Sequence, residues 1–150
     1  MSTRILVVAL VGLMTMAAAA RAQVGPDAFV TTDNELLVTV SNNEAALDSQ
    51  AAARVIEIHG IAKKILRTDS GDYVLQFAPD NRSDNFVRLH INCEFGRDQR
   101  DALGSIRLPA GITIRGAVKE SQWKPRYDNH RYYEMVIRDS QITATYALLR

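Results

Sequence analysis

The segment from Phe86 to Phe95 constrains the fold most, because apolar and polar residues alternate along it without interruption. The apolar positions are Val87, Leu89, Ile91, Cys93 and Phe95, and the polar positions are Arg88, His90, Asn92 and Glu94. A period of two places each set on one face of a β-strand. The segment therefore predicts a half-buried strand in a sheet that has one face in water.

Four further segments predict strands and bring the expected number to five. They are Arg54–Ile65, Tyr73–Ala78, Ile112–Lys119 and Tyr132–Thr143. Gly60 and Gly116 interrupt the alternation within their segments, and a glycine inside a strand marks a bulge or a sharp bend. Such bends allow one strand to belong to both sheets of a closed barrel.

Two segments predict helices. Thr32 and Glu35 match a capping box, and apolar residues at helical spacing follow, so a helix is expected from Asp33 to about Ser49. The β-branched residues within Leu36–Val40 would also suit a short strand. A second, short helix is expected within Arg97–Ile106, between the third and the fourth strand.

This order of elements predicts an all-β fold with added helices. Five strands with glycine bends, and a helix between the third and the fourth, describe a five-stranded OB-fold, a small Greek-key barrel, here preceded by an N-terminal helix. An immunoglobulin-like sandwich is the alternative. It needs about seven strands and has no helix at that position, so the OB-fold is preferred.

The N-terminus has the pattern of a bacterial secretory signal. Arg4 precedes an uncharged apolar run from Ile5 to Ala20, and Ala20-Arg21-Ala22 offers small residues for cleavage after Ala22. An uncleaved membrane anchor is the alternative, but the run is shorter than the about 20 residues of a spanning helix. A periplasmic or secreted protein without a membrane span is therefore expected. The predicted organisation is a signal peptide over residues 1–22, a linker over 23–31, an OB-fold domain over 32–143 and a tail over 144–150.

Charge and cysteine content limit the function classes further. The 150 residues carry 18 Lys and Arg against 17 Asp and Glu, so no overall field draws the molecule to nucleic acid or to an anionic membrane. Cys93 is the only cysteine, which excludes an internal disulfide in an oxidising compartment. The domain must therefore be stabilised by its core.

Several stretches of the mature chain resemble the tRNA-anticodon-binding-like OB-fold family of small secreted bacterial proteins. They are Thr32–Leu37 with Asn43 and Ala46, Val55–Ile61, Val87–Phe95, Leu108–Gly116 and Met135–Ile142. The resemblance covers about residues 32–142 and implies an OB-fold. Members often carry further cysteines on the last two strands, where this chain has Val118 and Ser140, so the resemblance implies no redox role here.

Patterns that carry catalysis or bind metal are missing from the sequence. His59, His90 and His130 are far apart, and neither paired metal ligands nor a nucleophile elbow is present. Asp98 and Asp101 lie near the start of a short helix, where acidic residues act as electrostatic caps. We therefore expect a protein that is not an enzyme and that needs neither metal nor cofactor. A small hydrolase or a redox enzyme that uses His90 or Cys93 is kept as an alternative.

The segment Ser121–Arg131 is predicted to be a long loop that mixes aromatic and cationic residues. In OB-folds this loop borders the ligand face formed by the second and third strands. Aromatic rings stack on bases or sugars, and cations hold acidic groups. The predicted ligand-binding residues are Tyr73, Arg88, His90, Trp123, Arg126, Tyr127 and Arg131, with Asn92 beside them. In the alternative interpretation, Trp123 and the tyrosines close the end of the barrel.

These observations predict an exported, non-enzymatic OB-fold module that binds a ligand or a partner. An envelope glycan or an envelope protein is favoured, because the predicted compartment and the near-neutral charge disfavour nucleic acid. Binding of single-stranded nucleic acid is kept as an alternative function. A structural protein that pairs through a sheet edge or through the helix face of Leu36, Val40 and Leu47 is another.

Overall fold

The computed structural model describes residues 28–51, 55–79, 87–127, 129–146 and 148, and for residues 126 and 127 it describes the backbone alone. The predicted signal peptide and its cleavage site lie outside this part of the chain and stay predictions. Within the described ranges, no helix has the length and apolar character needed to cross a membrane.

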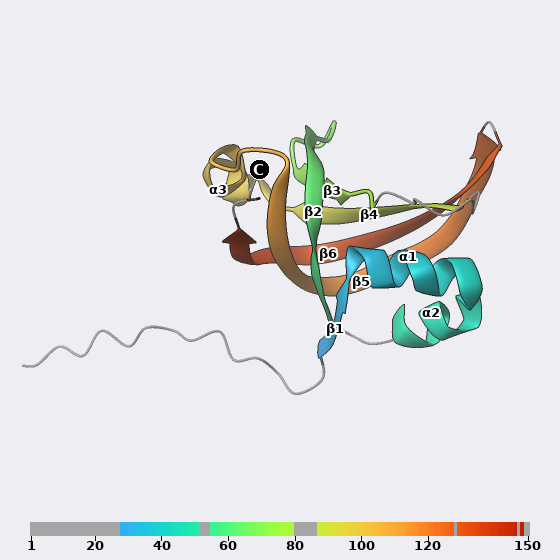
Figure 1. Cartoon of the computed structure of the whole chain (residues 1–150). Coiled ribbons are helices and arrows are strands. Elements are labelled where there is room, and N and C mark those ends of the chain that lie inside the picture. Colours follow the sequence, from blue (N-terminus) through green and yellow to red (C-terminus); the bar gives the residue numbers. More distant parts are fainter. Residues whose placement is uncertain (1–27, 52–54, 80–86, 128, 147, 149–150) are drawn as a thin grey trace, which may run out of the picture.

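Six strands form one mixed sheet (Figure 1). They are β1 (Ala28–Thr32), β2 (Val55–Arg67), β3 (Tyr73–Phe77), β4 (Val87–Phe95), β5 (Ala110–Tyr127) and β6 (His130–Tyr146). The strand order is β1-β2-β3-β4-β6-β5, and β2 also pairs with β5. The last five strands therefore form a closed ring of hydrogen-bonded neighbours, called the ring below. The sequence predicted five strands, and the sixth is β1.

Strand β1 corrects the predicted linker over residues 23–31. Ala28–Thr32 pair in parallel with Val55–His59 at the start of β2, whereas residues 23–27 lie outside the described ranges. Gly25 and Pro26 favour irregular backbone, but the irregular segment predicted from them included residues 28–31, which belong to β1. The five residues of β1 show no alternation of their own, because only Thr31 is buried.

Helices α1 (Asp33–Asn42) and α2 (Glu44–Ala51) replace the single helix predicted from Asp33 to Ser49. The predicted capping box is present: the Glu35 amide donates to the Thr32 hydroxyl over 3.1 Å, and the Thr32 amide donates to the Glu35 carboxylate over 3.0 Å. The helix breaks at Asn43, whose side-chain oxygen accepts from the Ala46 amide over 3.1 Å. Asparagine favours this capping role over a place inside a helix, which explains the break.

A buried contact joins α1 to β2. The Asp33 carboxylate accepts from the backbone amides of Asn34 at 2.8 Å and Ile61 at 3.1 Å. A Cβ at Gly60 would lie 2.6 Å from this carboxylate, so only glycine leaves room for it. Glycine at position 60 therefore has a specific cause, the approach of the first residue of α1. The register with β5 runs unbroken across Gly60, and the irregularity of β2 lies between Ala62 and Lys64. At the other predicted glycine, Gly116, the register of β5 with β6 does shift, between Arg115 and Ala117.

The long loop predicted over Ser121–Arg131 is wrong. Strand β5 continues to Tyr127 and β6 starts at His130, so the segment is the outer part of a β-hairpin. Cross-strand pairs such as Trp123 with Tyr133 and Lys124 with Tyr132 continue the ladder. Aromatic pairs across a ladder stabilise strands, which is why this polar stretch is extended.

The core fills the inside of the ring, where the apolar positions of β4 meet those of β2, β3, β5 and β6. Fully buried members include Phe77, Leu89, Ile91, Cys93 and Met135. The short helix α3 (Arg100–Gly104), preceded by a 3-10 turn (Arg97–Gln99), inserts Leu103 at one end. Leu36 of α1 and Leu47 of α2 also belong to the core. Figure 1 shows these two helices away from α3, on the other side of the ring.

Candidate ligand-binding face

Polar side chains of β3, β4, β5 and β6 share the outside of the ring. Leu75 and Phe77 are buried on β3, and Leu89, Ile91 and Cys93 are buried on β4, so the residues between them face outward. Register then assigns the facing positions on β5 and β6 to the same side. We call this surface the outer face; it comprises Gln76, Arg88, His90, Asn92, Lys124, Tyr132 and Glu134.

Four of these side chains form a continuous row of hydrogen bonds across four strands. Gln76 Nε2 donates to Asn92 Oδ1 over 2.9 Å, and Asn92 Nδ2 donates to Glu134 Oε2 over 3.1 Å. Lys124 Nζ lies 2.8 Å from Glu134 Oε1, and this contact raises the pKa of the Lys124 ammonium. Gln76, Asn92, Glu134 and Lys124 are called the polar row below. Each of its members is held in place by a neighbour.

Aromatic and basic groups lie beside the polar row. The rings of His90 and Tyr132 are 5.6 Å apart and tilted by 55°. An Arg88 guanidinium nitrogen lies 3.2 Å from His130 Nε2. Partial burial lowers the pKa of His90, and the positive charge of Lys64 adds to this effect while Glu134 opposes it. His90 is therefore neutral at pH 7 and offers one donor and one acceptor nitrogen.

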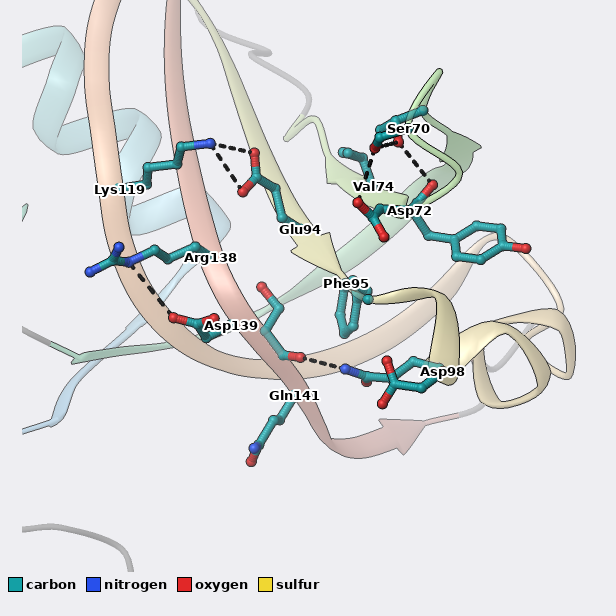
Figure 2. Close-up of a pocket in the computed structure, with 15 residues that line it drawn as sticks. Ser70, Asp72, Val74, Glu94, Phe95, Asp98, Lys119, Arg138, Asp139 and Gln141 are labelled. Atoms are coloured by element: carbon teal, nitrogen blue, oxygen red, sulfur yellow. Dashed lines mark hydrogen bonds and ion pairs between the residues drawn. The ribbon is translucent and has the colours of Figure 1, made fainter.

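A cleft of about 660 Å³ continues the outer face towards α3. It begins at Val74 and Glu94, the next outward positions on β3 and β4, and reaches the turn between β2 and β3. Figure 2 shows Lys119 bonded to Glu94 on one wall and Ser70 bonded to Asp72 on the other. Lys119 Nζ lies 3.0 Å from Glu94 Oε1.

Further contacts hold other charged residues of this cleft. Arg138 Nε lies 3.7 Å from Asp139 Oδ2, and Asp72 accepts from Ser70 over 2.9 Å. Asp139 has φ of 52°, a left-handed conformation that Asp tolerates better than most residues do. Asp139 lies where the register of β6 with β5 shifts, between the pairs Arg115–Gln141 and Ala117–Arg138. The cleft is thus a polar hollow lined by four carboxylates, those of Asp72, Glu94, Asp98 and Asp139, and by two cations, those of Lys119 and Arg138.

The structure places Trp123 and Arg131 on the opposite side of the hairpin from the outer face. Trp123 pairs with the buried Tyr133 across the ladder, at a ring distance of 5.0 Å. Arg131 lies over the Trp123 ring, 4.0 Å from its centroid. The indole nitrogen donates to Glu44 of α2. We call Trp123, Arg131 and Tyr133, with Glu44 of α2, the Trp123 cluster.

The other predicted ligand-binding residues lie in different places. Arg88 and His90 are on the outer face with Asn92, as the alternation of β4 predicted. Tyr73 pairs with Phe95 at the far end of the sheet, where it packs against the core and lines the cleft. The side chains of Arg126 and Tyr127 lie outside the described part of the structure. The predicted residues whose side chains are described are therefore divided between the outer face, the Trp123 cluster and the far end of the sheet.

Gln76, Glu134 and Lys124 are the polar-row residues that sequence reasoning missed. A signal for Glu134 was present, because it alternates with Tyr133 and Met135 in a segment already predicted to be a strand. Lys124 was assigned to a loop, and Gln76 is a single polar residue in a five-residue strand. Their convergence depends on the pairing of β3, β4, β5 and β6, which no local pattern specifies.

Cys93 and Thr113, two side chains with catalytic potential by residue type, are both buried. Cys93 is fully buried, and burial raises the pKa of its thiol, so it is not a reactive thiolate. Thr113 lies 2.8 Å from His59 Nδ1, and His59 Nε2 lies 3.4 Å from Glu57. This trio resembles a nucleophile with its base, but Thr113 is only 2% exposed and its hydroxyl cannot meet a substrate. Among the described residues, no cluster of three or more His, Cys, Asp or Glu could hold a metal ion.

Comparisons with known proteins add little to this geometry. No protein-family model matches the chain, and no curated protein matches it. It is similar to a solved structure described as a "putative nucleic acid-binding lipoprotein" from Klebsiella pneumoniae, with 17% sequence identity and a TM-score of 0.48. The match covers 77% of this chain and 91% of that chain. A likeness this distant carries no argument about ligand or location.

Proposed function

We propose that the ring is an OB-fold barrel with β1 added at its edge. The strand order supports this proposal: β2, β3 and β4 form a meander, and β6 lies between β4 and β5. β4 pairs with β6 in parallel, and β2 closes on β5 antiparallel. The helix α3 between β4 and β5 is the one expected of an OB-fold.

On this basis the chain is an exported, non-enzymatic binding module, and its ligand contacts the outer face. The observation that carries this function is the polar row. Its four side chains are only partly buried and are not needed to fill the core, yet hydrogen bonds fix each of them. Side chains that are ordered before binding lose little entropy when a ligand arrives. Strands β3 and β4, which carry Gln76 and Asn92, are the second and third strands of the proposed OB-fold, where such folds bind their ligands.

An envelope glycan or an envelope protein is the proposed ligand class, and export rests on the N-terminal signal pattern. Nucleic acid is disfavoured because affinity for it depends on the number of cations available to phosphates. On the outer face Lys124 is engaged by Glu134, and in the cleft Lys119 is engaged by Glu94. Few cations are left to neutralise a phosphate backbone.

The function is tested with immobilised panels of oligosaccharides, envelope proteins and oligonucleotides. The double variant Gln76→Ala/Asn92→Ala removes the amides of the polar row. Asn42→Ala, which removes an exposed amide from the end of α1, is the matched control. We expect the double variant to lose at least tenfold in affinity for the ligand that the panels reveal, and the control to bind like the wild type. A ligand that binds the double variant as tightly as the wild type would show that the outer face is not the site.

A further inference from the structure

We propose that the outer face binds an acidic oligosaccharide, a sugar chain in which some units carry a carboxylate. This inference rests on the proposed function and specifies the chemistry of its ligand. It combines three features of the surface: unused hydrogen-bonding capacity in the polar row, a ring pair beside it, and two cations at its borders. Each feature matches one part of such a ligand.

The amides of the polar row keep capacity for sugar hydroxyls. Each amide NH₂ has two hydrogens, and Gln76 and Asn92 each use one within the row. Gln76 Oε1 has no partner among the described residues, and neither ring nitrogen of the neutral His90 has one. A sugar hydroxyl both donates and accepts, so a surface that presents donors and acceptors side by side suits it. A phosphate diester accepts only, and it would leave the free acceptors unpaired.

The rings of His90 and Tyr132 supply aromatic surface against which a sugar can pack. The rings are 5.6 Å apart, and both side chains are half-buried on adjacent strands. The C–H face of a pyranose is apolar and packs against the negative face of an aromatic ring. The pair lies directly beside Glu134 because His90 and Glu134 occupy the same register position on β4 and β6. A sugar stacked there can reach the amides of the polar row.

Two cations at the borders of the outer face favour a carboxylate on the ligand. Lys64 of β2 is exposed and pairs in register with Gln76, so it extends the polar row by one strand. Arg88 contacts His130 and has no carboxylate partner among the described residues. Adjacent strands are about 4.8 Å apart, so Lys64 lies about 10 Å from the Asn92 strand, roughly the length of two sugar units. Glu134 is neutralised by Lys124 and does not cancel these charges.

The test compares two tetrasaccharides of equal length, tetragalacturonate and the neutral maltotetraose, by titration calorimetry with the mature protein at low and at physiological salt. The wild type is expected to bind tetragalacturonate at least fivefold more tightly than maltotetraose. Surface charges contribute modestly and are screened, so the preference is expected to shrink as salt is added. Lys64→Gln/Arg88→Gln should abolish the preference. Arg107→Gln/Arg115→Gln removes two positive charges elsewhere and should retain it.

The outcomes separate this inference from the proposed function. If both tetrasaccharides bind equally, and Gln76→Ala/Asn92→Ala weakens both, the acidic ligand is excluded while a binding role for the outer face stands. If neither tetrasaccharide binds but a peptide or an oligonucleotide binds in an Asn92-dependent manner, the saccharide is excluded and the face is retained. If the binding of every probe is insensitive to the Gln76 and Asn92 substitutions, both the inference and the proposed function are overturned.

Discussion

The two sides of the outer hairpin of β5 and β6 differ although they are built from the same two strands. On one side Trp123 is enclosed by Tyr133, by Arg131 and by Glu44 of α2. On the other side Lys124 and Glu134 end a row of polar groups that are partly exposed. The side richer in aromatic residues is therefore the one used for packing. The side rich in amides and charges is the one left available to a ligand.

This difference shows why residue composition alone assigned the binding site imperfectly. A tryptophan near cations suggests ligand stacking, but the same atoms satisfy each other when a helix lies beside them. The cation that would hold an acidic ligand, Arg131, is stacked on the Trp123 ring instead. Strand alternation decides between the two interpretations, because it separates Trp123 from Lys124 and Tyr133 from Glu134.

The largest expected effect on stability comes from truncating Leu47, the buried side chain of α2 on the packed side of the hairpin. Leu47 is fully buried, so Leu47→Ala should lower the free energy of unfolding by about 2–5 kcal/mol. Val38→Ala is the control, because Val38 is 58% exposed on the neighbouring helix. Urea denaturation measures both. Equal stability of the two variants would show that α2 is not docked on the hairpin.

The next effect tests whether Trp123 packs or binds. Trp123→Ala should lower the free energy of unfolding by about 1–3 kcal/mol, because a partly buried ring, its ring–ring contact with Tyr133 and its cation–π contact with Arg131 are lost. Affinity for the outer-face ligand should stay within twofold of that of the wild type. Trp123→Phe keeps much of the packing and should recover part of the stability. Loss of ligand binding in a fully folded Trp123→Phe variant would contradict the separation of the two sides.

A smaller effect is expected from the polar row itself. Asn92→Ala removes one hydrogen bond to Gln76 and one to Glu134 in a partly exposed setting. The free energy of unfolding should fall by about 1 kcal/mol or less, since exchange with water offsets most of such bonds. The free energy of ligand binding should lose a larger fraction of its wild-type value than the free energy of unfolding does. Thermal denaturation measures the stability, and ligand titration of the same sample measures the affinity. A variant with reduced stability and unchanged affinity would assign the row to stability alone.

The smallest effect concerns pH. Burial lowers the pKa of His90 below the ordinary value of 6.5, and Lys64 acts in the same direction, whereas Glu134 acts against it. Arg88 on β4 and the ring of Tyr132 on β6 also lie close to it on this face. The unfolded chain then binds more protons than the folded one just below pH 6.5, so the contribution of His90 to stability is present above that pH and is lost as the pH falls through the folded pKa. His90→Asn should flatten this part of the stability profile. NMR titration of the folded protein measures the pKa of His90 directly. A His90 ring signal that titrates above pH 6.5 would contradict the burial argument.

Much of the fold could be predicted from local patterns. The alternation of Phe86–Phe95 predicted β4 to within one residue, and the capping box placed the start of α1 at Asp33. The strands β3 and β5 and the short helix α3 were also predicted. The sequence did not predict β1 or the break at Asn43. It also did not predict that β5 continues to Tyr127 and that β6 starts at His130. One of these features depends on a partner distant in the sequence, because β1 pairs with β2. The hairpin depends on the cross-strand pairing of β5 with β6, which was not anticipated within the predicted loop.

The candidate site was predictable only in part, for a related reason. Arg88, His90 and Asn92 were identified because they share the polar face of one strand. The polar row instead joins side chains from four strands, and Gln76 is linked to Glu134 only through Asn92. Side-chain convergence of this kind follows from strand order and register, which residue periodicity does not encode.

The central claim is that ligand contacts the outer face and not the Trp123 cluster, and side-chain NMR tests it most directly. Trp123 is the only tryptophan, so its indole N–H gives a single signal, while Gln76 and Asn92 report through their side-chain amides. During titration of the mature protein with tetragalacturonate, the account predicts that the amide signals of Gln76 and Asn92 shift together and saturate, while the indole signal stays in place. An indole signal that shifts while both amide signals remain unchanged would contradict it.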